Sequence, residues 1–184
     1  MTDLVATNAF GGTAPRVQRL GPVTLSERMD IGLASLACAG TPPEPFGMGL
    51  AAPGRAVAGE GVGNFWMAPG QWMIEGTGRG DDDFAGALLG EVPGAIVTDQ
   101  TDGWVILDID GPAAAIEQMR ERLVNLPAGA LAPGGATRTL LHHMTVFVIR
   151  RGPDRLTVMG MRSYAGSLWH ALAEVAGRLE TAEG

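Results

Sequence analysis

The residues of this chain that most often ligate metals or act as nucleophiles are three histidines and one cysteine. His142 and His143 are adjacent in an expected strand, so their side chains point to opposite faces and cannot bind one metal ion together. His170 lies beside Trp169 on an expected helix, and a surface or interface position explains it better than a metal site. Cys38 has no basic neighbour that would activate its thiol. We therefore expect no metal site and no cysteine nucleophile.

Two carboxylates and two serines are the remaining candidates for catalysis. Asp108 and Asp110 are spaced i, i+2 on an expected strand, which places both on one face. Asp110 is better explained as a helix cap, and no third acidic or basic group is tied to the pair. Ser163, Ser167 and His170 lie within two helical turns, but nothing around them resembles a nucleophile elbow. The sequence therefore predicts no catalytic residue.

The stretch 76–80 is rich in glycine and lies between an expected strand and an expected helix, where phosphates often bind. It lacks the dinucleotide-binding spacing, and it has neither the lysine nor the hydroxyl of a phosphate-binding loop. Asp81, Asp82 and Asp83 follow at the helix start, where carboxylates complement the helix dipole and would repel a phosphate. We interpret the stretch as a flexible loop followed by an acidic helix cap, with no cofactor-binding residue.

The C-terminal third contains the clearest secondary-structure pattern. Residues 139–150 are apolar and β-branched and predict one strand. Residues 151–154 predict a tight turn, and residues 156–161 predict the returning strand. Ser163 is the expected N-cap of a final helix. Its apolar stripe at helical spacing comprises Tyr164, Leu168, Leu172, Val175 and Leu179.

A similar unit occurs earlier in the chain. Residues 64–68 and 71–75 predict a hairpin, and a helix is expected to begin near Asp81. The hexamer 84–89 of that helix shares three of six residues with 164–169. The identities alone are compatible with chance or with an internal duplication, and the position of each hexamer after a hairpin favours duplication.

The other segments complete a mixed fold. Residues 94–98 and 104–109 predict two strands, and a helix follows from Pro112 until Pro127 ends it. The order from residue 64 is strand-strand-helix three times, which predicts an α+β fold with antiparallel sheets and helices on one face. The uncovered face of such a sheet needs helices, the N-terminal arm or another subunit to cover it.

The N-terminal residues differ from the rest of the chain. Residues 1–22 have no sustained hydrophobic period and predict an extended arm, either mobile or laid against a partner. Residues 23–184 are expected to form a single domain.

Composition limits the classes of partner and compartment. Acidic residues outnumber basic ones 20 to 13, giving a formal net charge of −7, which argues against binding nucleic acid or an anionic membrane surface. One cysteine excludes an internal disulfide, and there is no signal-peptide pattern and no apolar run of membrane-spanning length. We expect a cytoplasmic protein.

Tryptophan and arginine are the residues that most often anchor protein interfaces. The four tryptophans are expected to be mostly core residues, and four arginines gather near the C-terminal hairpin, either as a solvated strand end or as a docking site for an acidic partner. The candidate interface residues are Trp66, Trp72, Arg138, Arg162, Ser167 and Trp169.

Several motifs resemble the γ subunit of heterotetrameric sarcosine oxidase. They are the run 135–139, the segment 161–169 (MRSYAGSLW) at the start of the last helix, the W-x-x-P-x-x-W hairpin 66–72, and the strand-Gly-Pro-Ala-Ala stretch 107–114. The resemblance covers about residues 60–178 and has the motifs in the family's order. One departure is the segment LVNLPA after the middle helix, which lacks the family's Cys-Pro-x-Asp-Leu.

The resemblance implies a fold like the folate-binding domain of aminomethyltransferases, built from two ferredoxin-like units. It also implies a non-catalytic subunit that assembles with α, β and δ subunits into an enzyme that oxidatively demethylates sarcosine to glycine. In that family FAD, FMN, NAD, tetrahydrofolate and zinc belong to the other subunits, and this chain would bind none of them.

Two alternatives remain open. The chain could be the equivalent subunit of a related N-methyl amino acid dehydrogenase, for example one acting on N-methylglutamate. It could also be a stand-alone folate-binding protein, which needs a carboxylate or arginine in a central pocket to hold the pterin and the glutamate tail. Asp108, Asp110 and Arg138 are the candidates for that role.

Overall fold

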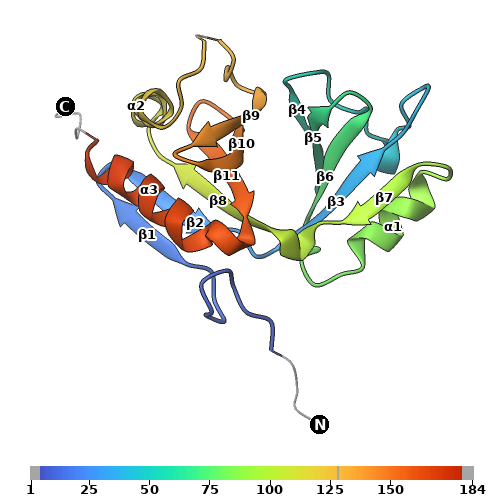
Figure 1. The fold of residues 1–184 in the computed structure, drawn as a ribbon, viewed down its shortest axis with the longest axis horizontal. Coiled ribbons are helices and arrows are strands. Elements are labelled where there is room, and N and C mark those ends of the chain that lie inside the picture. The colour runs from blue at the N-terminus through green and yellow to red at the C-terminus, as the bar shows by residue number, and fades with distance from the viewer. Residues whose placement is uncertain (1–4, 128, 180–184) are drawn as a thin grey trace.

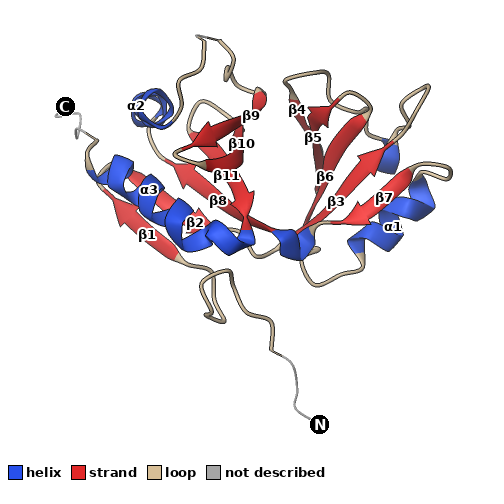
Figure 2. Cartoon of the chain, in the orientation of Figure 1, coloured by secondary structure: helices blue, strands red, loops and turns tan. Residues whose placement is uncertain are grey.

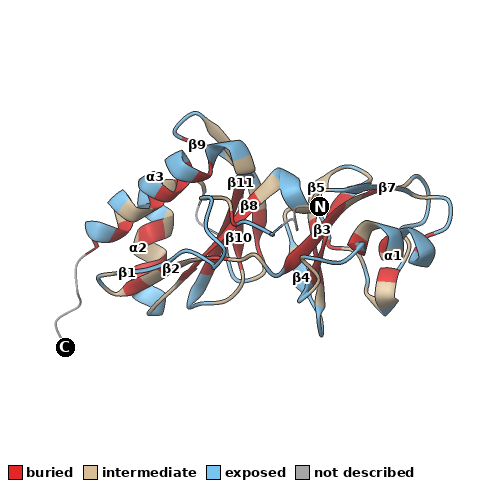
Figure 3. Cartoon of the chain, turned by 90° about the horizontal axis from the view of Figure 1, so that it is seen from below, coloured by how far each residue is buried: buried red, intermediate tan, exposed pale blue. Residues whose placement is uncertain are grey.

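The computed structural model describes residues 5–127 and 129–179, in which two antiparallel sheets lie side by side with helices on their outer faces (Figure 1, Figure 2). This is the predicted α+β fold class. Along each strand, side chains alternate between the helices on one face and the second sheet on the other. Buried residues accordingly follow the strands and the inward stripes of the helices (Figure 3).

The first sheet has six strands in the order β1-β2-β8-β11-β10-β9. Their bounds are Val17–Leu20 (β1), Val23–Glu27 (β2), Trp104–Asp110 (β8), Arg155–Met161 (β11), Met144–Arg150 (β10) and Ala136–Leu141 (β9). Helices α2 (Ala113–Leu123) and α3 (Ala165–Gly177) cover one face of this sheet. The core between them includes Leu107, Val158 and Leu168, none of which is exposed to solvent.

The second sheet has five strands in the order β4-β5-β6-β3-β7. Their bounds are Ala56–Ala58 (β4), Val62–Ala68 (β5), Gln71–Thr77 (β6), Ile31–Ala37 (β3) and Ile96–Asp99 (β7). Helix α1 (Phe84–Glu91) and the 3-10 turn η1 (Pro45–Gly47) pack on its outer face. Ile74, Phe84 and Leu88 are buried in the core there.

Both halves are built on the same ferredoxin-like βαββαβ unit. In such a unit the strands take the spatial order 4-1-3-2, which is the order of β2-β8-β11-β10 in the first sheet and β7-β3-β6-β5 in the second. The first half takes its fourth strand, β2, from the start of the chain, and in the second half the segment containing η1 replaces the first helix. Strands β9 and β4 are added at equivalent edges. The predicted pair of ferredoxin-like units is confirmed.

The remaining face of each sheet packs against the other sheet. The ring of Phe147 in β10 has its centroid 5.1 Å from that of Phe65 in β5 and 5.5 Å from that of Trp104. Ile31 and Met159 are buried in the same cluster. The uncovered face that the sequence left open is therefore covered from within the chain.

The prediction of one strand for residues 139–150 is wrong. Two strands, β9 and β10, occupy this stretch, and their pairing begins between Leu141 and Met144. The reversal lies at His142 and His143, where His142 takes a left-handed φ of 49°. The turn contains neither glycine nor proline and is flanked by apolar residues, so the sequence carries no turn signal there.

The predicted helix starts have mixed outcomes. Asp83 caps α1 by accepting a backbone N–H of its first turn at 2.8 Å, as an acidic cap should. Ser163 is not the cap of α3, because it lies inside a preceding 3-10 turn, η3 (Arg162–Tyr164). Asp110 is not a helix cap either, because its carboxylate pairs with the Arg155 guanidinium at 2.5 Å.

Residues 17–20 of the predicted extended arm 1–22 form strand β1, which pairs with β2. Ala9, Phe10 and Arg16, before β1, contact other parts of the chain. The buried Glu27 carboxylate accepts the backbone N–H of Ala9 at 2.8 Å and that of Arg16 at 3.1 Å. These bonds tie the described part of the arm to the end of β2.

Candidate functional site

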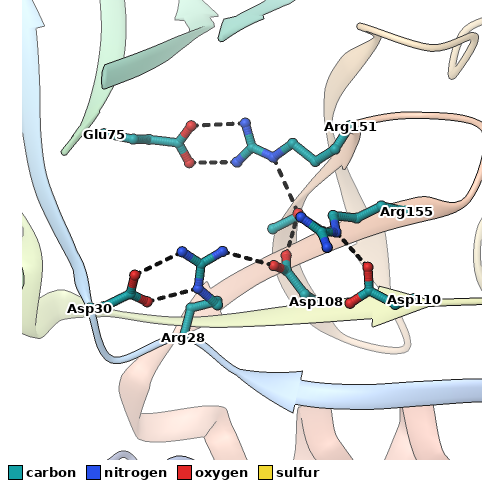
Figure 4. A network of polar contacts seen from close by, with 8 residues as sticks. Arg28, Asp30, Glu75, Asp108, Asp110, Arg151 and Arg155 are labelled. Carbon is teal, nitrogen blue, oxygen red and sulfur yellow. Dashed lines mark hydrogen bonds and ion pairs between the residues drawn. The ribbon is translucent and has the colours of Figure 1, made fainter. Parts of the chain in front are cut away.

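The two sheets enclose a cavity of about 250 Å³. Its lining combines charged residues with apolar ones, namely Arg28, Ile31, Ala58, Gly59, Val62, Gly63, Glu75, Thr77, Ile106, Asp108, Arg151 and Arg155. Its volume lies just below the roughly 300–1,000 Å³ of ordinary small-molecule sites. The charged lining residues come from both halves of the molecule (Figure 4).

A two-bond ion pair connects the sheets across this cavity. The Arg151 guanidinium, which follows β10, donates to both carboxylate oxygens of Glu75 in β6 at 2.8 and 2.5 Å (Figure 4). The side chain of Glu75 is only 9% exposed, and that of Arg151 is 21% exposed. A buried carboxylate needs such a partner, because removing it from water is costly.

A second cluster of polar contacts surrounds Asp108 of β8. The hydroxyl of Thr157 donates to its carboxylate at 2.5 Å, and Arg28 donates to it at 3.1 Å. Thr157 also accepts a hydrogen bond from Arg151 at 3.2 Å, which joins this cluster to the inter-sheet pair. Arg28 additionally holds Asp30 through two bonds of 2.7 and 2.8 Å.

Electrostatics reinforces these pairings. The hydrogen bond with Asp30 raises the pKa of the Arg28 guanidinium above its ordinary range, and the same bond lowers the pKa of the Asp30 carboxyl. The bond with Asp110 likewise raises the pKa of Arg155. Within the network each carboxylate has a guanidinium partner and each guanidinium has a carboxylate.

These pairings decide whether the cavity can hold folate. Asp108 and Asp110 do reach the cavity side of β8, but each is already bonded to an arginine, Arg28 or Arg155. Arg138 lies elsewhere, exposed on β9, so the three folate candidates do not form one pocket. The residues present do not fit a group that needs an unpaired carboxylate or guanidinium, and we derive no folate chemistry for this chain.

The network also corrects one sequence-based statement. The sequence tied no third charged group to Asp108 and Asp110, whereas the structure brings Arg28 and Arg155 to them. Arg155 lies in β11, and Arg28 lies between β2 and β3, 80 positions away from Asp108. Only the topology of the sheets brings these residues together.

The other candidates for chemistry remain apart. In residues 5–127 and 129–179 no three His, Cys, Asp or Glu side chains are arranged to hold a metal ion. His142 and His143 are exposed in the β9–β10 turn, so they lie in a turn and not in a strand. Ser167 and His170 are exposed on α3, and Cys38 is half-buried after β3.

Two of the predicted interface residues are core residues. Trp72 is 8% exposed, faces α1, and donates its indole N–H to the backbone oxygen of Ala51 at 2.8 Å. Trp169 is 3% exposed and lies under the N-terminal arm, with the Phe10 ring at 5.3 Å and the Arg16 guanidinium at 4.3 Å. The chain itself already buries both rings.

The other four predicted interface residues lie on different elements. Trp66 is half-buried on β5, Arg138 is exposed on β9, and Ser167 is exposed on α3. Arg162 donates to the backbone oxygen of Thr7 at 2.6 Å and so holds the arm. The structure does not bring them together as one surface.

The C-terminal arginines are also separated. Arg150 donates to the Pro153 backbone oxygen at 2.6 Å and lies 3.9 Å from the Glu117 carboxylate of α2, and burial lowers its pKa. Its neighbour Arg151 turns to the opposite face of the sheet and pairs with Glu75. Adjacent residues on a strand point to opposite faces, so they cannot form one basic patch.

Solved structures share this architecture. A chain of the heterotetrameric sarcosine oxidase from Corynebacterium sp. U-96, in complex with pyrrole 2-carboxylate, superposes with a TM-score of 0.69 at 21% identity, covering 87% of this chain and 88% of that one. The chain has the fold of a sarcosine oxidase chain. The glycine cleavage system aminomethyltransferase T from Bartonella henselae matches with a TM-score of 0.58 at 17% identity, covering 83% of this chain and 46% of that one. The predicted resemblance is confirmed at the level of the fold.

Comparison of the amino-acid sequence with known families and curated proteins does not assign this chain to a family. Neither a protein-family model nor a curated protein sequence matches this chain. None of the helices in the described residues combines the length and hydrophobicity that a bilayer crossing requires.

Proposed function

We propose that this chain is a non-catalytic subunit, equivalent to γ, of a heterotetrameric sarcosine oxidase. The observation that carries the proposal is the reciprocal coverage with a chain of such an oxidase, 87% in one direction and 88% in the other. The match to aminomethyltransferase T spans only 46% of that protein, so this chain corresponds to part of that enzyme. The match to the oxidase covers nearly all of both chains, so this chain corresponds to one whole chain of such an oxidase.

The charged groups inside the molecule join its two halves, as a structural role would require. In the cavity Glu75 is paired with Arg151, and Asp108 is paired with Arg28 and Thr157. Arg151 also donates to Thr157, so these contacts form one network between the two sheets. The proposed role is to assemble and stabilise α, β and δ subunits that carry FAD, FMN, NAD, tetrahydrofolate and zinc.

Co-purification of the tagged chain from its native cells tests this proposal. We expect a complex with larger, yellow subunits that contains flavin and oxidises sarcosine. A complex that oxidises another N-methyl amino acid in preference to sarcosine would replace the substrate and keep the subunit role. Recovery of a colourless chain alone would contradict the proposal, and binding of tetrahydrofolate to that chain would then support the stand-alone alternative.

A further inference from the structure

Strand β9 leaves one edge of the first sheet open. Its inner edge pairs with β10 from Leu141 opposite Met144 to Ala136 opposite Ile149. At the start of its outer edge the Ala136 N–H donates to the Gly54 backbone oxygen at 2.9 Å, and an isolated bridge joins Arg55 to the neighbouring glycine. Beyond this point no other strand of the described residues pairs with the outer edge.

The pairing pattern shows which backbone groups face outward. Gly135 accepts the Arg150 N–H at 2.8 Å, so odd-numbered residues of this stretch bond toward β10. The Ala136 N–H points away from β10, because the backbone groups of successive strand residues alternate between the two edges of the strand. The N–H and C=O groups of Arg138 and Leu140 therefore point away from β10, and neither residue has a backbone partner outside the strand pairing among the described residues.

The side chains beside these groups fit a particular kind of strand. Leu140 is 66% exposed, and Arg138 is exposed with no ion pair among the described residues. Both lie on the same face of β9, next to a surface groove of about 400 Å³ lined by Arg138, Thr139, Leu140 and Thr145. The Arg138 guanidinium lies 5.9 Å from the centroid of the Phe147 ring but has no carboxylate partner among the described residues. A guanidinium of this kind, two residues from an exposed leucine, complements a segment in which a carboxylate alternates with an apolar residue.

The other edges of the two sheets are shorter. Strands β1 and β7 have four residues each and β4 has three, whereas β9 has six. Proteins protect an exposed edge with short length, proline, lysine or a bulge. Strand β9 has neither proline nor lysine, its pairing with β10 contains no bulge, and Arg138 is its one charged side chain.

We propose that the outer edge of β9 receives an extended acidic and apolar segment of a partner subunit as a seventh strand. This inference rests on the proposed function, because it requires a partner complex. The segment would begin just after Ala136, whose N–H is already bonded to Gly54. Its backbone would bond to Arg138 and Leu140, and one of its carboxylates would lie near the Arg138 guanidinium.

Proline at position 140 tests the backbone contact. Leu140→Pro removes an N–H that the pairing with β10 does not use, so the chain can keep its fold while the edge loses its donor. Val17→Pro is the matched control, because Val17 is 62% exposed on β1, at the opposite edge of the same sheet. The bond from Glu27 N–H to Arg16 shows that Val17 also faces outward.

Both variants are expressed as the tagged full chain and purified with their native partners. We expect Leu140→Pro to weaken assembly by at least about tenfold and Val17→Pro to change it by less than about twofold. Equal assembly of both, with wild-type circular dichroism, would overturn the inference, and loss with Val17→Pro alone would assign the contact to β1. If Leu140→Pro does not fold, Arg138→Glu decides instead, since a repulsive carboxylate at the edge should also reduce assembly.

Hydrogen exchange in the intact wild-type complex gives an independent readout. The amides of Arg138 and Leu140 should exchange slowly in the complex, and those of Val17 and Arg19 should exchange rapidly. Rapid exchange at Arg138 and Leu140 would overturn the inference while the complex itself still supports the proposed function. A wild-type chain that purifies without partners would overturn both.

Discussion

The two halves of the molecule share the ferredoxin-like unit but differ in the segments that pack on it. Strand β6 before α1 and strand β11 before α3 have the same burial pattern, exposed at both ends and buried at the five positions between. Each has a glycine at its second-to-last position, Gly76 or Gly160, under the following helix. The duplication inferred from two hexamers therefore extends to strand order and packing.

Equivalent positions of the two hexamers nevertheless differ in burial. Phe84 is 1% exposed, whereas its counterpart Tyr164 is 50% exposed. Leu89 is 51% exposed, whereas its counterpart Trp169 is 3% exposed. Phe10 and Arg16 of the N-terminal arm lie on Trp169 in the first half, and they turn a surface position of the repeated unit into a core position.

The largest expected effect tests this difference directly. Trp169→Ala should lower the free energy of unfolding by about 3–5 kcal/mol, because it empties a core site beneath Phe10 and Arg16. Leu89→Ala, the equivalent change in the second half, should alter it by less than about 0.5 kcal/mol. Urea unfolding of both variants measures the two values. Similar losses for both would show that the arm does not create the difference.

The next effect concerns the contact between the halves. Arg151→Met should lower the free energy of unfolding by about 3 kcal/mol, because it leaves the buried Glu75 carboxylate without a partner. The double variant with Glu75→Met should be more stable than Arg151→Met, since it removes the uncompensated charge. A double variant less stable than the single one would show that the pair is not what couples the sheets. Urea unfolding again provides the measurement.

Replacing the two equivalent glycines, Gly76 and Gly160, by alanine should lower the free energy of unfolding by different amounts. A Cβ at Gly76 would lie 2.6 Å from the buried Phe84 ring, whereas a Cβ at Gly160 would lie 2.8 Å from one methyl of Leu168. Gly76→Ala should therefore cost about 2–3 kcal/mol and Gly160→Ala about 1 kcal/mol, because a methyl can move more easily than a packed ring. Thermal unfolding of the two variants compares them, and a larger loss for Gly160→Ala would reverse this explanation.

The sequence predicts the repeated unit well because its signals are local. The hairpin 64–75, the helix after Asp83 and the stripe around Leu168 each depend on residues close together in the chain. The failures occur where a local signal is missing or ambiguous. His142 and His143 reverse the chain without glycine or proline, and Ser163 resembles a cap although a 3-10 turn precedes the helix.

The polar network could not be predicted from the sequence. Glu75 and Arg151 are 76 positions apart, and Arg28 and Asp108 are 80 positions apart. Each pairing requires two sheets facing each other, which no local pattern specifies. The same reason explains Trp72 and Trp169, whose burial depends on Ala51 and on the arm, segments far from them in the chain.

The smallest expected effect concerns the link between β2 and β3, one of two links between the halves in the described residues. The bond from Arg28 lowers the pKa of Asp30 below its ordinary value of 3.8, so the pair stabilises the folded state above that pH and is lost as the pH falls through the lowered pKa. The Asp30 carboxylate is half exposed, so Asp30→Asn should cost less than about 1 kcal/mol near neutral pH. Its difference from the wild type should shrink as the pH is lowered from about 5 toward 1 in urea unfolding experiments. A difference that stays constant over this range would show that Arg28 is held at the junction by Asp108, whose buried carboxylate it also contacts.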